Sequence, residues 1–406
     1  MPKNNSNFFE SKKPWSVTKD ELLANYLTIY FVKIFATHKD VLYIDCFAGA
    51  GKFEDGKNGS PLIAFDAYKT AYKISKQPQQ IYWKFIEAKN YYRQLEINTQ
   101  HIKNNEVIHG KYEDNIIEIL KKFSSRMNVF LYIDPYGTKA MKYDIFDQIS
   151  KIQTNSLELL INFNSFGFIR DACSALAIES DLDAKIFNDL EETDPTQIDR
   201  SQRSIELLNS IAHGNYWVEI INNNKKPNGK CNGIAAEKEF MERYRQELRK
   251  LFNYVLDMPI LLKDKGRPVY RMIHLTNHWD GCALMAENML NRSKVHVLEV
   301  QRKGKVDLFS NVDQDLEGNF INAEDIHKKL ITLLDSYKGK KRLSEIIADF
   351  YTEYGALCKL KALKDILKDM GTNKEIVIEC FDGSQKSEDV FMTEKSNKTV
   401  WIGRAK

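Results

Sequence analysis

The sequence contains only six cysteines, and their spacing matches no metal-binding or disulfide pattern. No two of the six form a Cys-x-x-Cys unit, and none stands in a cluster with histidine. Structural zinc sites need such clusters, and disulfide frameworks are typical of short secreted chains that are dense in cysteine. We therefore expect neither a metal site nor a disulfide framework. The six are Cys46, Cys173, Cys231, Cys282, Cys358 and Cys380.

Two further absences narrow the class of protein. Basic residues barely outnumber acidic ones (59 against 56, net charge +3), so any nucleic-acid binding must use local clusters of charge. No apolar run reaches the length of a membrane span, and no charged-then-apolar leader opens the sequence. We expect a soluble, cytoplasmic protein without membrane contact, and its 406 residues favour two domains.

A glycine-containing turn is the most informative segment that is present. Residues 41–51 read Val-Leu-Tyr-Ile-Asp-Cys-Phe-Ala-Gly-Ala-Gly, and a helix is expected to begin near Pro61. A strand, a turn without bulky side chains and a helix suit a nucleotide-type ligand, although an ordinary tight turn has the same elements. The string resembles the first motif of class I S-adenosylmethionine-dependent methyltransferases. That resemblance implies a cofactor site at Asp45, Phe47, Ala48, Gly49 and Gly51.

A second strand ends in a related signal. Residues 128–134 form a buried-strand pattern that runs into Asp134, Pro135, Tyr136 and a glycine. This resembles the Asp-Pro-Pro-Tyr-type motif of methyltransferases that act on exocyclic amino groups of nucleobases. A carboxylate and a backbone carbonyl can accept the two N–H bonds of such an amino group, and an aromatic ring can stack on an extruded base. The alternative is a common strand-terminating turn.

The first 170 residues together are similar to one family, the three-Cys-motif partner proteins. The matching segments lie at residues 8–16, 23–27, 45–56, 59–64 and 134–137. The resemblance implies a methyltransferase-like domain, often followed by a winged helix, encoded beside a protein that carries a three-cysteine motif. It indicates the fold better than the reaction.

Other cofactor contacts are predicted from strand ends. Lys19, on a helix before the first strand, is placed near the methionine carboxylate, with a plain packing helix as the alternative. Glu87 ends the strand at residues 81–86, where a carboxylate can hold ribose hydroxyls. After the third strand, Lys111 stands where an acid is expected for adenine, so Tyr112 or Asp114 is the substitute.

The rest of the first domain, residues 1–310, is expected to complete a Rossmann-like α/β sheet. Residues 162–167 after the fifth strand either line a base pocket or cap that strand. A mainly helical insertion is predicted at about 171–257. Strand 269–276 and an antiparallel edge hairpin involving 295–300 should follow.

The segment 322–406 has the pattern of a winged helix-turn-helix domain. Three helical stretches precede two β-like stretches, and the third helix carries lysines that could face phosphates. A winged helix that docks a protein is the alternative. The lysines are Lys359, Lys361 and Lys364.

Two function classes follow. The first is a methyltransferase that uses S-adenosylmethionine to modify a nucleobase amino group in DNA or RNA, working with the three-Cys-motif protein. The second is an inactive methyltransferase fold that serves as a scaffold for that protein. The glycine turn together with Asp134 and Pro135 favours the enzyme.

Overall fold

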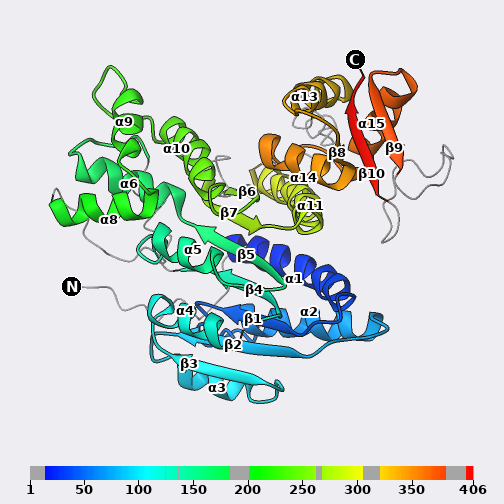
Figure 1. Ribbon diagram of the computed structural model, residues 1–406. Helices are drawn as coiled ribbons and strands as arrows, with labels where there is room; N and C mark the ends of the chain where they lie inside the picture. Colours follow the sequence, from blue (N-terminus) through cyan, green and yellow to red (C-terminus); the bar gives the residue numbers. More distant parts are fainter. Residues whose placement is uncertain are drawn as a thin grey trace.

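A seven-stranded sheet forms the centre of the structure (Figure 1). This computed structural model describes residues 14–123, 125–135, 137–182, 201–261, 268–304, 321–380 and 399–405. The strand order is β3-β2-β1-β4-β5-β7-β6, in which β1 to β5 run parallel, β7 is antiparallel to β5, and β6 is antiparallel to β7. The strands are β1 (Val41–Asp45), β2 (Ile81–Glu87), β3 (Asn105–His109), β4 (Asn128–Ile133), β5 (Ser156–Phe163), β6 (Tyr254–Leu261) and β7 (Pro268–Thr276).

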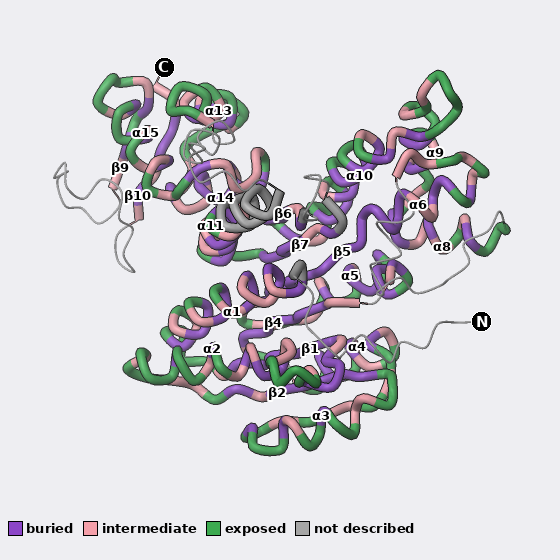
Figure 2. The backbone as a smooth tube through the Cα atoms, turned by 180° about the vertical axis from the view of Figure 1, so that it is seen from behind, coloured by how far each residue is buried: buried purple, intermediate pink, exposed green. Residues whose placement is uncertain are grey.

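The parallel strands are nearly continuous apolar runs because helices cover both faces of the sheet. Along β1, Val41 and Tyr43 face one core, while Leu42 and Ile44 face the other. Figure 2 shows these strands buried between exposed helix faces. The first core is covered by α1 (Pro14–Phe35), α2 (Ser60–Ile74) and α11 (Trp279–Gly304), and the second by α4 (Tyr112–Phe123), α5 (Tyr143–Ser150), α6 (Ser165–Ala175) and α10 (Gly233–Leu248).

The parallel order places the ends of particular strands together. β1 lies between β2 and β4, so the chain leaves β1 in one direction and returns on its other side. In open α/β sheets, ligands bind outside the carboxyl ends of the strands at such a switch point. The predicted α/β sheet with an antiparallel edge is confirmed.

Helix α3 (Tyr92–Thr99) packs near β3 at the opposite edge of the sheet.

The partner in the antiparallel hairpin differs from the expectation. Residues 254–261, assigned in part to the helical insertion, form β6 and pair with β7 along its length. Residues 295–300 instead continue α11. The prediction of a hairpin there was wrong because no glycine or proline interrupts the helical pattern between Leu290 and Val295.

The remaining insertion is helical, as predicted, but ends earlier. It contains α8 (Gln202–Ala212), α9 (Tyr216–Asn223) and α10, and residues 183–200 lie outside the described ranges. Ser201 and Asn232 cap α8 and α10 by accepting backbone N–H bonds with their side chains. The insertion follows β5 and therefore rises from the carboxyl edge of the sheet (Figure 1).

The carboxyl-terminal segment combines three helices with a small antiparallel sheet of order β8-β10-β9. It packs on α11 and β6, and the Cys282 thiol of α11 lies 3.6 Å from the Ala348 carbonyl oxygen. Residues 305–320 lie outside the described ranges, so the division into domains at 310 and 322 stays a prediction. The elements are α13 (Ala323–Asp335), β8 (Lys341–Arg342), α14 (Leu343–Tyr354), α15 (Leu360–Thr372), β9 (Ile376–Cys380) and β10 (Val400–Arg404).

None of the helices in the described ranges combines the length and the apolar character that crossing a membrane requires.

Candidate active site

The turn after β1 adopts the backbone that its glycines permit. Gly49 and Gly51 have φ values of +59° and +73°, in the left-handed region that side chains with a Cβ rarely occupy. A Cβ built on Gly51 would lie 3.0 Å from Leu95 Cδ1, so space is short there as well. The Gly49 N–H donates to Glu87 Oε2 at 2.8 Å. The turn is therefore fixed both by its conformation and by the end of β2.

Glu87 is buried at this edge and accepts two backbone N–H bonds. Its second oxygen, Oε1, accepts from the Lys89 N–H at 2.7 Å. Burial raises the pKa of Glu87, while the bonds from Lys89 and Gly49 oppose that change. Each carboxylate oxygen offers two lone pairs, so the group retains capacity to accept a further hydroxyl.

Asp45 closes β1 and is completely buried. Its Oδ1 accepts the Phe47 N–H at 3.2 Å. Burial raises the pKa of Asp45 to about 7, against the opposing effect of hydrogen bonds from Ser60 and Phe47. The nearby charges of Asp134 and Glu87 raise this pKa further. The carboxyl groups at the ends of three strands are therefore close enough for electrostatic repulsion to affect the pKa of Asp45.

Asp134 follows β4 and lies in a dense polar cluster. Lys19 Nζ contacts both of its oxygens, at 3.0 and 3.1 Å, and the lysine side chain is only 4% exposed. The Asn162 side-chain amide donates to Oδ1 at 2.7 Å, and the Tyr132 hydroxyl donates to Oδ2 at 3.2 Å. Two contacts on each oxygen occupy the four acceptor positions of a carboxylate. These contacts therefore hold the Asp134 side chain in one orientation.

A cavity of about 300 Å³ opens beside the glycine turn. Its wall joins residues from the ends of β1, β2, β3 and β4, so the topology brings separate strand-end signals to one place. Among the residues expected from the sequence, Phe47, Glu87, Tyr112 and Pro135 line it. The full lining is Cys46, Phe47, Glu87, Ala88, Lys89, Gly110, Lys111, Tyr112, Glu113, Pro135, Gly137, Lys139 and Ala140.

The loop after β3 separates the two residues proposed for the adenine contact. Tyr112 is buried beside Phe47, with ring centroids 5.6 Å apart. Its hydroxyl has no hydrogen-bond partner in the described part of the chain, and burial raises its pKa. Asp114 is exposed and does not line the cavity, whereas Glu113 does. Of the two candidates, only Tyr112 is positioned to meet a ligand in this cavity.

Residues 162–167 were expected either to line a base pocket or to cap β5, and the structure shows both kinds of position. Asn164 caps α6 by accepting the Gly167 N–H at 2.7 Å, and Phe166 is buried in the core. These two follow the strand-capping alternative. Asn162 instead contacts Asp134, and its amide oxygen has no partner among the described residues.

Several predicted site residues lie away from this cavity. Lys19 lies at Asp134, on the first-core side of the sheet, and also 5.5 Å from the centre of the Tyr270 ring. Tyr136 lies outside the described residues. Lys359 and Lys361 of the carboxyl-terminal segment are exposed, while Lys364 lines a small cavity against Trp279. Within the described ranges, no group of three or more His, Cys, Asp or Glu side chains could hold a metal ion.

The contacts of Tyr132, Lys111 and Glu113 with the site were not expected from the sequence. The only available signal for Tyr132 was its position two residues before Asp134, because alternate residues of a strand share a face. Lys111 and Glu113 line the cavity because they flank Tyr112 in the loop after β3.

Comparison with known proteins adds weak likenesses. The sequence matches no family profile and no curated relative. Among solved structures, a putative methyltransferase, yhhF, from Escherichia coli is 15% identical, with 30% of this chain and 57% of that chain covered and a TM-score of 0.22. DszA carbon methyltransferase is 10% identical, with coverage of 66% and 56% and a TM-score of 0.34. The plantazolicin methyltransferase BamL, solved with SAH, is 11% identical, with coverage of 67% and 88% and a TM-score of 0.28. The chain thus spans little more than half of the first of these proteins.

Proposed function

We propose that this chain is an S-adenosylmethionine-dependent methyltransferase that acts on an exocyclic amino group of a nucleobase in DNA or RNA. The observation that carries the proposal is a strand-end cavity lined both by Pro135, which follows Asp134, and by Cys46 and Phe47, which begin the glycine turn. The sequence motifs suggested both parts separately, and the sheet topology brings them to one edge.

The residues around the cavity fit the cofactor. The positive φ values of the glycines allow the tight turn that brings Phe47 to the cavity wall, and Glu87 stands at the end of β2, where a carboxylate can accept the ribose hydroxyls. Phe47 and Tyr112 supply aromatic surface for the adenine. When bound, S-adenosylmethionine supplies the electrophilic methyl group.

Asp134 is assigned to position the target amino group. The nitrogen lone pair of such a group is delocalised into the ring, so a carboxylate that accepts one of its N–H bonds makes the nitrogen a better nucleophile. All four acceptor positions of Asp134 are occupied here. One donor must therefore give way to the substrate, and Lys19 is the natural one because it uses two of those positions. Lys19 then retains a single contact with Asp134.

The same ion pair favours a second candidate function. A carboxylate saturated by a buried lysine would suit a methyltransferase fold that no longer catalyses and that serves as a scaffold. In either case the partner proposed is the three-Cys-motif protein implied by the amino-terminal resemblance. Co-expression followed by size-exclusion chromatography tests that partnership.

The carboxyl-terminal elements are assigned as a winged helix. Their order, helix, short strand, two helices and a strand pair, supports that assignment. Lys359, Lys361 and Lys364 on or before α15 form no ion pair among the described residues, and we assign them to phosphate contacts.

The deciding experiment has two steps. Isothermal titration of S-adenosylmethionine into the purified chain tests the cofactor assignment, and no heat at millimolar cofactor would contradict it. Incubation of the chain with its partner, labelled S-adenosylmethionine and total RNA or genomic DNA, followed by nucleoside mass spectrometry, then tests the reaction. Cofactor binding without any methylated nucleoside would favour the scaffold.

A further inference from the structure

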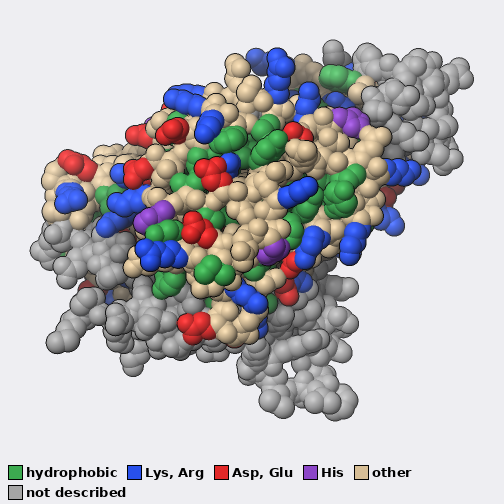
Figure 3. Space-filling model, turned by 90° about the horizontal axis from the view of Figure 1, so that it is seen from below, with side chains coloured by type: hydrophobic (Ala, Val, Ile, Leu, Met, Phe, Trp, Pro, Cys, Tyr) green, Lys and Arg blue, Asp and Glu red, His purple; other side chains and the backbone are tan. Residues whose placement is uncertain are grey.

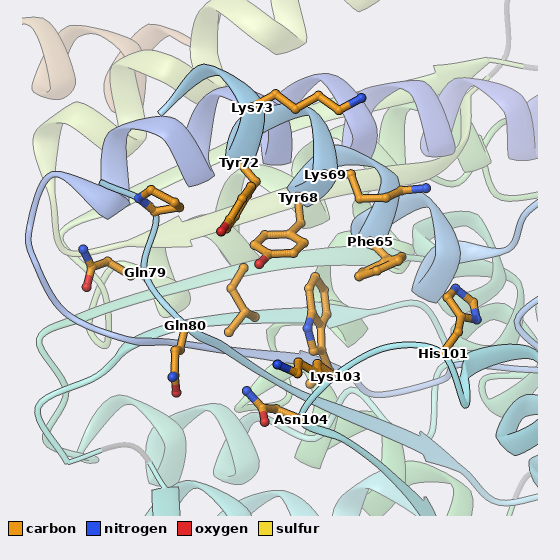
Figure 4. Close-up of a pocket in the computed structure, with 13 residues that line it drawn as sticks. Phe65, Tyr68, Lys69, Tyr72, Lys73, Gln79, Gln80, His101, Lys103 and Asn104 are labelled. Carbon is orange, nitrogen blue, oxygen red and sulfur yellow. The ribbon is translucent and has the colours of Figure 1, made fainter. Parts of the chain in front are cut away.

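A second cavity, of about 650 Å³, opens at the amino edge of the sheet (Figure 4). It lies at the start of β2, whereas the candidate active site lies at the end of that strand, about 20 Å away at roughly 3.3 Å per residue. Helix α2 and the segments that enter β2 and β3 form its walls. The lining is Phe65, Tyr68, Lys69, Tyr72, Lys73, Pro78, Gln79, Gln80, Ile81, Trp83, His101, Lys103 and Asn104. We call it the amino-edge trough.

Aromatic rings form one wall and the floor of the trough. The Tyr68 ring lies 5.7 Å from Tyr72 at 65° and 5.7 Å from Trp83 at 74°, so the three rings pack edge to face. Trp83 is buried in the core, whereas Tyr72 is 52% exposed. Neither phenol hydroxyl forms a hydrogen bond with another described residue. The ring surface is therefore firmly supported from beneath and open to solvent above.

The charge of the trough has one sign. Three lysines line it and no acidic residue does. Lys69 is paired with Asp66 at 2.6 Å, but Lys73 and Lys103 form no ion pair within the described ranges. In Figure 4, Lys103 and Asn104 lie below the tyrosine rings, while Lys73 extends along the helix above them. Seen from below, basic and acidic side chains are interspersed on the molecule (Figure 3), so the local excess in the trough matters more than a broad field.

We propose that the amino-edge trough binds a single-stranded segment of nucleic acid. A base stacks on the exposed face of Tyr72, which Tyr68 supports edge to face, and the flanking phosphates contact Lys73 on one wall and Lys103 on the other. Aromatic platforms combined with lysines are the usual way in which proteins hold single strands, because every base has a flat face and every nucleotide a charge. A duplex, whose bases are stacked and paired internally, cannot offer the base face.

A strand fits the trough better than a free nucleotide does. The lysines stand on opposite walls, one on α2 and one before β3, and a chain with phosphates on both sides of a base can reach both. Side-chain amides of Gln79, Gln80 and Asn104 add hydrogen-bonding groups along the wall without a fixed pattern. The site is therefore expected to hold a strand with little sequence preference. This proposal does not depend on methyl transfer.

The test is fluorescence anisotropy of a labelled short single-stranded oligonucleotide with the full chain, as DNA and as RNA, at low and high salt. Tyr72→Ala is expected to weaken binding by about 5- to 150-fold, because base–aromatic stacking contributes about 1–3 kcal/mol per base. Lys103→Glu is expected to weaken binding and flatten its salt dependence. The controls are Ile74→Ala, a 62% exposed apolar residue on the same helix outside the trough, and Lys121→Glu on α4.

Three results would overturn the proposal. They are no binding of the oligonucleotide at low salt, equal binding by Tyr72→Ala and Ile74→Ala, and adenosine monophosphate or duplex binding as tightly as the single strand. Titration of S-adenosylmethionine into Tyr72→Ala separates the two sites, since its affinity should match that of the unmodified chain. If neither the unmodified chain nor its variants bind S-adenosylmethionine but the oligonucleotide still binds, the proposed methyltransferase function is contradicted and the proposal for the trough stands.

Discussion

The two edges of the central sheet carry opposite kinds of polar chemistry. At the carboxyl edge, Asp45, Glu87 and Asp134 are held by donors from their own chain. At the amino edge, Lys73, Lys103 and the tyrosine hydroxyls of the trough have no such partners among the described residues. Groups that are already bonded are fixed in place, which suits chemistry at a defined atom. Groups that are unbonded and half exposed suit a ligand that varies in sequence.

The largest expected effect comes from breaking the carboxyl edge at Asp134. Asp134→Asn should lower methyl transfer by about 100- to 1000-fold, the loss typical of removing one transition-state contact. Cofactor affinity should change little, because Asp134 does not line the cavity. Turnover of nucleic acid with labelled cofactor and isothermal titration measure the two quantities.

That variant also leaves Lys19 buried without its counter-ion, which can destabilise the fold by about 3–5 kcal/mol. The double variant Lys19→Met/Asp134→Asn removes both charges and serves as the control. It should regain stability in urea unfolding but not activity. Normal turnover by either variant would exclude the amino-methylation mechanism.

The buried acid at the end of β1 predicts a pH dependence of stability. Because the folded pKa of Asp45 is about 7 against 3.8 in a model peptide, the folded state binds the extra proton between these values. The contribution of Asp45 therefore favours folding at low pH and is lost as pH rises towards 7, by about 2 kcal/mol between pH 5 and 6.5.

Asp45→Asn cannot ionise and should remove this part of the slope. Urea unfolding of both proteins between pH 5 and 8 measures it, and the variant should gain stability relative to the unmodified chain as pH rises. Parallel curves for the two proteins would show that Asp45 does not carry the effect.

The glycine turn allows a matched pair of substitutions. Gly51 and Gly56 both have positive φ, so an alanine at either should cost about 1–2 kcal/mol of stability. A Cβ at Gly51 meets Leu95 Cδ1 at 3.0 Å, whereas nothing lies within 4 Å at Gly56. Gly51→Ala should weaken S-adenosylmethionine binding about tenfold or more, and Gly56→Ala should not. If isothermal titration gives equal cofactor affinities for Gly51→Ala and Gly56→Ala, the turn at Gly51 is not part of the cofactor site.

The smallest expected effect concerns the carboxyl-terminal segment. Reversing Lys359, Lys361 and Lys364 to glutamate together should reduce the salt slope of nucleic-acid binding by about one unit for each phosphate that these lysines neutralise. The effect should add to that of Tyr72→Ala, because well-separated sites act independently. If this triple variant keeps the salt slope of the unmodified chain in anisotropy titrations but no longer associates with the three-Cys-motif protein, the lysines serve protein docking instead.

The sequence was enough to predict the parallel sheet and the ends of its strands. Uninterrupted apolar runs such as those before Asp45 and Asp134 have few alternatives to a strand covered on both faces. The antiparallel edge was predicted, but its partner was misplaced, since β6 and residues 295–300 are both rich in apolar and β-branched residues. The absence of glycine and proline between Leu290 and Val295 was a local signal for a continued helix, but the pairing of β6 with β7 depends on contacts that the local pattern does not contain.

The candidate site shows the same division. Asp45, Glu87 and Asp134 could be selected from the sequence because each ends or directly follows a strand, and parallel strands bring such ends to one edge. The Lys19–Asp134 pair, the choice of Tyr112 over Asp114 and the amino-edge trough could not. They join side chains far apart in the chain, and only the packing of α1, α2 and the β3 loops against the sheet decides whether those side chains meet. Local patterns determined where polar groups stand, and the tertiary structure decided which of them are already bonded and which remain available to a ligand.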